Sequence, residues 1–185
     1  MNKALVINLF GGPGCGKSTT MAKLFADLKV MGYNVEMVSE FAKDLVYEQR
    51  HETMKDEMYI FAKQHHRLFR VCDKVDIIIT DRPLLLTNIY VGLYLPDSDF
   101  KKDLMRLVRT TYNNFNNLNI YLKRSGINYQ TEGRLQNLEE AEKIDKLTLE
   151  ELSLSKQSYC SRQTRNYAII LDTVLDCIKM MDYED

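Results

Sequence analysis

The stretch Gly11-Gly12-Pro13-Gly14-Cys15-Gly16-Lys17-Ser18 matches the pattern G-x-x-x-x-G-K-[ST] at every fixed position. Glycines in such a stretch allow backbone torsions that turn successive N–H groups towards an anion. Residues 4–10 before it are mostly apolar and predict a buried strand, while residues 17–31 after it have the period of an amphipathic helix. A strand, a glycine-rich turn and a helix N-terminus in this order are typical of a phosphate-binding loop.

The residue types in the loop predict how a nucleoside triphosphate would bind. We expect the backbone of residues 11–19, from Gly11 to Thr19, to surround the phosphates. Lys17 would place its charge between the β- and γ-phosphates, and the Ser18 hydroxyl would bind Mg²⁺. Cys15 occupies a variable position of the pattern and is interpreted as a small packing residue, not a redox site. The expected ligands are therefore ATP or GTP with Mg²⁺.

Strand-like and helical segments alternate along the rest of the chain. Further strands are expected at residues 34–38, 75–80, 120–123 and 167–171, and helices near residue 45 and at 53–74, 84–94, 98–115, 138–157 and 174–181. This order is typical of an α/β fold in three layers, with a five-stranded parallel sheet between helices. Residues 113–119 are expected to form a connection and residues 124–137 a lid. The length of 185 residues suits one domain, residues 1–185.

Acidic residues follow the second and third predicted strands. We expect Glu40 to accept the proton of an acceptor hydroxyl or to orient that hydroxyl, and Asp81 to hold Mg²⁺ directly or through water. Which of the two acts as the base stays open. The carboxyl ends of parallel strands form the ligand-binding edge of such a sheet, so both residues are expected at one site. Asp44 and Arg82 are expected to bind the acceptor substrate. The alternatives left open are a surface charge for Asp44 and a structural ion pair for Arg82.

Two arginines flank the predicted lid, Arg124 and Arg134. Phosphoryl transfer spreads negative charge over the γ-phosphate oxygens, and an arginine brought to that charge stabilises it. We expect this role for Arg134, and for Arg124 we leave it open beside simple solvation.

Composition narrows the choice of partners. The formal net charge is −1, which does not favour nucleic acid as an obligatory partner, although basic residues cluster near residues 63–74 and 101–109. No apolar run approaches the roughly 20 residues of a membrane span. The four cysteines show neither a CxxC pair nor zinc-ligand spacing, so free thiols and a cytoplasmic location are expected.

Taken together, these motifs resemble the P-loop kinases of nucleosides and nucleotides, and most closely the ribosylnicotinamide kinase domains of NadR-type proteins. The resemblance is carried by the loop at 11–18, the acidic segment 39–44, Asp81-Arg82, and the arginine-bearing residues 124 and 132–134 before a charged helix. It implies a P-loop NTPase fold and transfer of the γ-phosphoryl group of ATP or GTP to a hydroxyl or phosphate of a nucleoside-like acceptor. The catalytic set would be Lys17, Glu40, Asp81 and Arg134.

The acceptor is not fixed by this resemblance, because Asp81-Arg82-Pro83 is closer to the D-R-x of nucleotide kinases than to the NadR-type pattern. A P-loop kinase acting on a hydroxymethylated base in DNA is one alternative. A nucleotide-binding regulatory NTPase is another, from a different functional class. Oligomeric state stays open.

Overall fold

The computed structural model describes residues 4–124 and 137–182. Its sheet has five strands in the order β2-β3-β1-β4-β5, all paired in parallel. The strands are β1 (Leu5–Phe10), β2 (Val35–Val38), β3 (Ile77–Thr80), β4 (Asn116–Lys123) and β5 (Cys160–Gln163). The predicted α/β fold with a five-stranded parallel sheet is confirmed.

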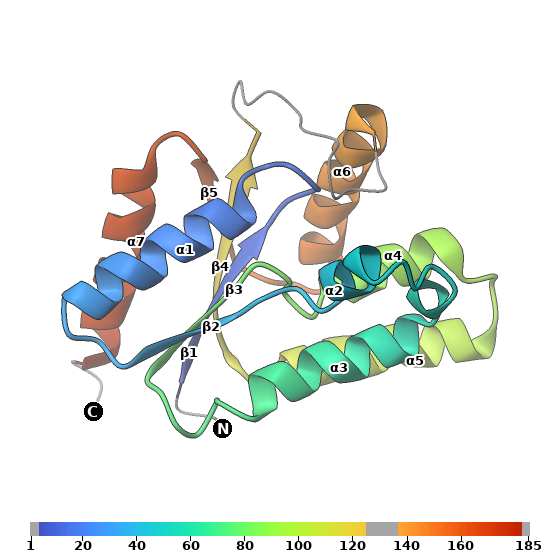
Figure 1. Cartoon of the computed structure of the whole chain (residues 1–185), viewed down its shortest axis with the longest axis horizontal. Helices are drawn as coiled ribbons and strands as arrows, with labels where there is room; N and C mark the ends of the chain where they lie inside the picture. The colour runs from blue at the N-terminus through green and yellow to red at the C-terminus, as the bar shows by residue number, and fades with distance from the viewer. Residues whose placement is uncertain (1–3, 125–136, 183–185) are drawn as a thin grey trace.

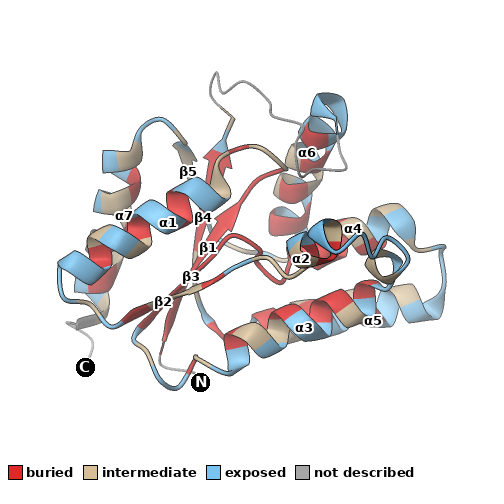
Figure 2. Ribbon diagram, in the orientation of Figure 1, coloured by how far each residue is buried: buried red, intermediate tan, exposed pale blue. Residues whose placement is uncertain are grey.

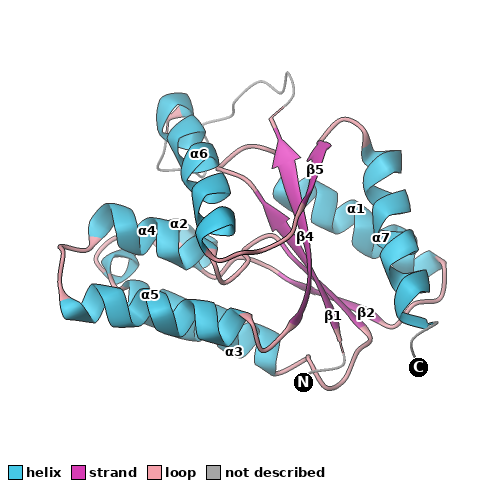
Figure 3. Cartoon of the chain, turned by 180° about the vertical axis from the view of Figure 1, so that it is seen from behind, coloured by secondary structure: helices cyan, strands magenta, loops and turns pink. Residues whose placement is uncertain are grey.

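Helices connect the strands and cover both faces of the sheet (Figure 1). They are α1 (Lys17–Val30), α2 (Ala42–Tyr47), α3 (Glu57–Phe69), α4 (Leu86–Tyr94), α5 (Asp99–Tyr112), α6 (Leu138–Leu154) and α7 (Tyr167–Asp182), with a 3₁₀ turn, η1 (Thr53–Lys55), before α3. Helices α1 and α7 lie on one side of the sheet and α3, α4, α5 and α6 on the other, as the reverse view in Figure 3 also shows. None of the described helices is both long and apolar enough to cross a membrane.

The central strand β1 divides the core between the two faces. All six of its residues are buried, so the sheet is buried along its centre (Figure 2). Leu5, Ile7 and Leu9 belong to the cluster that contains the apolar residues of α1 and α7, whereas Val6 and Phe10 belong to the opposite cluster. Alternation with period two is what a strand covered on both sides requires.

The polar residue of β1 explains an error in the predicted boundaries. Asn8 donates from Nδ2 to Oδ1 of Asn117 at 2.9 Å and to Oδ1 of Asn119 at 3.2 Å, and Asn119 is its register partner. Tyr112 also donates to Asn119. Because these groups satisfy one another, Asn119 can be buried in β4. The prediction of a connection at 113–119 was wrong for residues 116–119, which belong to β4.

The fifth strand was also predicted in the wrong place. Residues 167–171 begin helix α7, where Ile170, Val174 and Ile178 are buried at intervals of four residues. The fifth strand of the structure is instead β5, which lies at the edge of the sheet and whose residues are half-buried or exposed. An edge strand of this kind has no apolar run to reveal it in the sequence.

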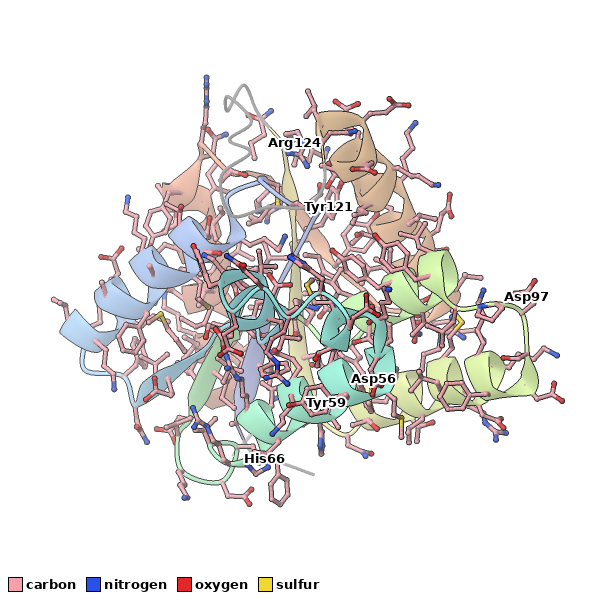
Figure 4. The ribbon with its side chains drawn as sticks, turned by 45° about the vertical axis from the view of Figure 1, so that its right-hand side comes forward. Asp56, Tyr59, His66, Asp97, Tyr121 and Arg124 are labelled. Atoms are coloured by element: carbon pink, nitrogen blue, oxygen red, sulfur yellow. The ribbon has the colours of Figure 1, made fainter. Side chains whose placement is uncertain are left out.

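The start of the helix predicted at 53–74 was displaced as well. Helix α3 begins at Glu57, and the Asp56 carboxylate caps it by accepting from the Tyr59 backbone N–H at 2.9 Å. Figure 4 labels Asp56 and Tyr59 at this end of α3 and His66 at the other end. Glu57 follows this cap directly, in the first turn of α3, and is buried.

Candidate active site

The glycine-rich loop has the backbone conformation that its sequence predicted. Gly11, Gly14 and Gly16 have φ values of 134°, 76° and 93°, a region that other residues rarely adopt. Gly16 is also the N-cap of α1 and offers no side chain to the helix N–H groups. Those donors therefore remain available to an anion, and the partial positive charge of the helix end favours one.

Lys17 and Ser18 leave this loop in different directions. Lys17 Nζ donates to the carbonyl oxygens of Gly11 at 2.6 Å and Gly12 at 2.9 Å, so its charge lies over the loop. Ser18 Oγ donates to Asp81 Oδ2 at 2.6 Å. The loop after β1 and the end of β3 are thus joined at a hydroxyl and a carboxylate.

Asp81 also fixes the residue that follows β2. Its Oδ1 accepts from the backbone N–H of Glu40 at 3.0 Å, and its side chain is buried. The Glu40 carboxylate in turn accepts from Arg82 Nη1 at 3.2 Å. Carboxyl ends of β2 and β3 are adjacent in the sheet, and this adjacency brings Glu40, Asp81 and Arg82 together as predicted.

Arg82 is buried in a polar and aromatic environment. Its side chain is only 6% exposed, and its guanidinium carbon lies 4.3 Å from the centroid of the Tyr90 ring. Burial disfavours the charged form, but Glu40, Tyr90 and Glu57 outweigh it and raise the pKa of Arg82 above its usual value. Arg82 is therefore a fixed cation at the centre of the site.

One cavity of about 770 Å³ contains these groups. Lys17, Ser18, Glu40, Asp81 and Arg82 all line it. Further lining residues come from elements that follow the second and third strands, and include His51, Met54, Glu57, Ile60, Leu86, Tyr90 and Tyr94. A space of this size takes a small organic ligand beside the phosphate groups of a nucleotide.

Glu57 is an acid that the sequence reasoning missed. It lies in the first turn of α3, is 4% exposed, and its Oε2 has no hydrogen-bond partner among the described residues. Burial raises the pKa of Glu57 from its ordinary value of 4.5 to about 7, with the Arg82 charge opposing and Asp56 adding to the rise. The helical period could have indicated its burial, since Glu57 lies on the same face of α3 as the buried residues Ile60, Phe61 and Leu68.

The pKa of Glu57 gives a prediction for stability. An acid whose pKa is higher in the folded state stabilises the fold below its unfolded pKa of 4.5, and this contribution is lost as the pH rises through about 7. Glu57→Gln cannot ionise, so its stability relative to the parent should rise by roughly 3 kcal/mol between pH 5 and pH 8. Denaturant unfolding at both pH values measures this, with the exposed Glu150→Gln as the matched control. A Glu57→Gln difference that does not change with pH would contradict the assignment.

Arg124, one of the two predicted lid arginines, is tied to the loop. Its Nη2 donates to the Pro13 carbonyl oxygen at 2.9 Å, and its guanidinium bonds Asp145 Oδ2 at 3.0 and 3.1 Å. Asp145 Oδ1 accepts from the Gly12 N–H at 2.5 Å. Figure 4 shows Arg124 at the end of β4, near α6. The ion pair of Arg124 and Asp145, called the clasp below, therefore connects α6 to the phosphate-binding loop.

This clasp should be measurable as stability. Both side chains are 15% exposed, so replacing Asp145 removes a charged group from beside a largely buried guanidinium. We expect Asp145→Ala to lower the free energy of unfolding by roughly 3 kcal/mol, and the double variant with Arg124→Ala to recover part of that loss. Chemical denaturation of the single and double variants tests this. Strictly additive losses would show that the two residues do not act as a pair.

Asp44, a predicted substrate-binding residue, does not line the cavity. It forms an ion pair with Arg67 of α3. Arg134 and most of the predicted lid at 124–137 lie outside the described residues. The loop residue Cys15 is buried and packs with Leu9 and Leu24 in the core.

The side chains present fit magnesium bound with a nucleotide. Among the described residues, no three or more His, Cys, Asp or Glu side chains cluster as a metal site. Magnesium does not need such a cluster, because it retains water and binds through one or two protein oxygens together with phosphate oxygens. The adjacent Ser18 hydroxyl and Asp81 carboxylate are hard oxygen ligands of that kind.

The basic residues of α5 are paired with acids. Each basic side chain has a nitrogen within 3.0 Å of a carboxylate oxygen, in the pairs Lys101–Asp97, Lys102–Asp99, Arg106–Asp103 and Arg109–Glu151. Their charges are thereby largely compensated along the helix, so α5 does not present a net basic face.

Comparisons with known proteins agree with this architecture. A family model described as an AAA domain matches residues 6–168. No curated protein sequence matches the chain. The structure is similar to a crystal structure of NadR protein in complex with NR, with a TM-score of 0.72 and 19% identity over 94% of this chain and 51% of that one. It is also similar to NadR protein in complex with NAD and AMP-PNP, with a TM-score of 0.62, 19% identity, and coverage of 94% and 49%.

A third similar structure is thymidylate kinase from Candida albicans, with a TM-score of 0.63 and 13% identity over 99% of this chain and 94% of that one. The chain spans about half the length of the NadR chains but nearly all of the thymidylate kinase chain. At these identities the structural likeness establishes the fold. Because the family match covers most of the sequence and includes the phosphate-binding loop, the chain belongs to the AAA-domain family of P-loop NTPases.

Proposed function

We propose that this protein is a kinase that transfers the γ-phosphoryl group of ATP or GTP to a hydroxyl or phosphate of a nucleoside or nucleotide-like acceptor. The observation that carries this proposal is the convergence of two sets of residues in one cavity. Lys17 and Ser18 come from the phosphate-binding loop, and Asp81 hydrogen-bonds Ser18. Glu40 and Arg82, an acid and a cation, lie against them in the same cavity.

The residues divide the work of transfer. The loop N–H groups and Lys17 bind the phosphates and stabilise the charge on the γ-phosphoryl oxygens. Glu40 accepts the proton of the acceptor hydroxyl as its oxygen bonds to the γ-phosphorus, while the bond from that phosphorus to the β–γ bridging oxygen breaks and the nucleoside diphosphate leaves. Arg82 holds the Glu40 carboxylate in place. When the acceptor is a phosphate, no proton transfer is needed, and Arg82 binds the acceptor phosphate instead.

Magnesium has a defined place in this proposal. Ser18 and Asp81 would hold it, and when bound it neutralises charge on the phosphate oxygens. Arg134 is proposed to stabilise the transferring group from the lid, a role that rests on the sequence resemblance. Enzymes of this kind work mainly by positioning and charge stabilisation, for which a preorganised cavity suffices.

The acceptor side separates a kinase from a regulatory NTPase. A nucleotide switch needs the phosphate-binding loop and magnesium ligands, but has no use for an acid paired with a buried arginine on the acceptor side of the same cavity. Glu40 and Arg82 form such a pair at 3.2 Å. The compensated charges of α5 give no support to a DNA acceptor, so small nucleosides and nucleotides are the first class to test.

The proposal is tested with a panel of acceptors. The protein is incubated with Mg²⁺ and γ-labelled ATP or GTP, and with nucleosides, nucleoside monophosphates or an oligonucleotide carrying hydroxymethyluracil. Label in one class of small acceptor supports the proposal and identifies donor and acceptor. Label only in the oligonucleotide would replace it with DNA phosphorylation, and label only in inorganic phosphate would indicate an NTPase.

A further inference from the structure

Two buried polar atoms on residues that line the cavity have no hydrogen-bond partner among the described residues. Four buried side-chain atoms of the described chain lack a hydrogen-bond partner, and two of them, Glu57 Oε2 and Arg82 Nε, belong to residues that line the cavity. An unpaired buried polar atom is costly, and folded proteins retain few of them. One acceptor oxygen and one N–H donor are therefore left unpaired on residues that line the cavity.

A second buried glutamate shows how this fold satisfies a carboxylate when no ligand is involved. Glu151 of α6 is 5% exposed, close to the 4% of Glu57. Its oxygens accept from Asn88 at 2.7 Å, from Arg109 at 2.8 and 2.9 Å and from Ser155 at 2.8 Å. Glu57 is buried to the same extent, but its Oε2 lacks such hydrogen bonds. Packing alone therefore does not explain why a carboxylate occupies this position.

The surroundings of Glu57 suit a flat ring. Apolar and aromatic side chains line the same cavity, namely Met54, Ile60, Leu86, Tyr90 and Tyr94. The centroids of the Tyr90 and Tyr94 rings lie 6.1 Å apart with an angle of 30° between the ring planes, and Arg82 covers a face of Tyr90. Apolar walls with a few polar atoms are the usual form of a site that binds a ring and recognises its edge.

We propose that Glu57 determines acceptor specificity by accepting a hydrogen bond from an N–H group on the edge of the acceptor's ring, while Arg82 Nε donates to the neighbouring acceptor atom of that edge. An N–H beside a carbonyl is the edge that amides and lactams carry, so the substrate class is a nucleoside with such an edge. This inference rests on the proposed function, since it describes the acceptor of that transfer. Glu57 touches the ring and not the reacting atoms.

The chemistry of the two side chains agrees with this pairing. Burial holds the pKa of Glu57 near 7, and an N–H donor from a ligand would favour the ionised carboxylate. Arg82 uses Nη1 for Glu40, which leaves its Nε on the other side of the guanidinium for the ligand. Arg82 thereby connects the ring-recognising acid to the proposed base.

The experiment compares nucleosides that differ only in this N–H. Uridine is paired with N3-methyluridine, and inosine with N1-methylinosine, with ATP as donor. For the parent, kcat/KM for the unmethylated member of at least one pair should exceed that of its methylated partner by about 10- to 100-fold, the effect of a hydrogen bond to a charged group. In Glu57→Ala this preference should disappear, and Glu57→Gln should keep part of it because its amide oxygen still accepts. The exposed Glu150→Ala is the control and should behave as the parent.

Binding of the same four nucleosides, measured by calorimetry, separates this inference from the proposed function. Absence of transfer to any acceptor would defeat the proposed function, whereas a parent that binds unmethylated nucleosides more tightly and a Glu57→Ala variant that does not would still support the role of Glu57. An equal preference in the parent and Glu57→Ala, no preference in the parent, or no binding of either pair would each overturn it. Thermal unfolding of each variant confirms that it is folded.

Discussion

Lys17→Ala is expected to abolish phosphoryl transfer in a protein that remains folded. Lys17 is the one charged residue in the loop sequence 11–18. Its ammonium group lies over the loop, where it donates to the carbonyl oxygens of Gly11 and Gly12. Removing one preorganised donor from a transferring group lowers turnover by about 10²–10³-fold, and a full charge at the γ-phosphate should matter at least as much. Turnover of labelled ATP with the identified acceptor measures this effect.

The control for that variant is on the same helix. Lys29→Ala removes an exposed lysine from the last turn of α1, far from the loop, and should leave turnover unchanged. Circular dichroism and thermal unfolding establish that both variants fold. If folded Lys17→Ala turned over as fast as the parent, the glycine-rich loop would not be the site of phosphate transfer.

Glu40→Gln is expected to lose most transfer to a hydroxyl acceptor while binding ATP almost normally. Glutamine can still accept a hydrogen bond from Arg82, so the positioning of the side chain is largely retained. It cannot take up the proton. The loss should lie in the lower part of a range of about 10²–10⁴-fold, because a loose transition state for phosphoryl transfer requires little base assistance.

Comparison with Asp81→Asn separates the base from the magnesium ligand. Asp81 holds Ser18 and the Glu40 backbone, so its loss should depress acceptor transfer and background ATP hydrolysis together. Glu40→Gln should depress transfer more than hydrolysis, since water does not depend on the acceptor side. The exposed Glu48→Gln serves as control. Equal losses of both reactions in Glu40→Gln would place Glu40 with the metal-binding residues, and unchanged transfer would remove it from the mechanism.

The sequence was sufficient for those parts of the fold that depend on local pattern. The glycine-rich loop requires particular residue types, and the buried strands β1 and β3 are mostly apolar, so their places in the chain and their parallel direction could be predicted. The edge strand β5 could not be predicted, because its stability comes from pairing with β4 and not from an apolar run. The strand at residues 116–119 was missed for a related reason. The hydrogen bond between Asn8 and Asn119 joins two different strands, so it cannot be seen in the sequence of either strand alone.

The same distinction applies to the candidate site. Glu40, Asp81 and Arg82 follow strands, and the geometry of a parallel sheet brings strand ends together. Glu57 and Asp145 belong to helices, and their contribution depends on how those helices are oriented against the sheet. Asp44 is the opposite case, a residue that was predicted at the site and does not lie there. It follows Glu40 by four residues, but its carboxylate pairs with Arg67 on the neighbouring helix.

The most direct test of the account is a phosphorus NMR measurement of the reaction products. The protein is incubated with Mg²⁺, ATP or GTP and the nucleoside that accepts label most efficiently, and the resonances are followed with time. A kinase should give nucleoside diphosphate and a phosphorylated acceptor in equal amounts, with little inorganic phosphate, because Glu40 and Arg82 are proposed to direct the γ-phosphoryl group to an acceptor. Diphosphate accompanied only by inorganic phosphate, with every acceptor unchanged, would contradict it.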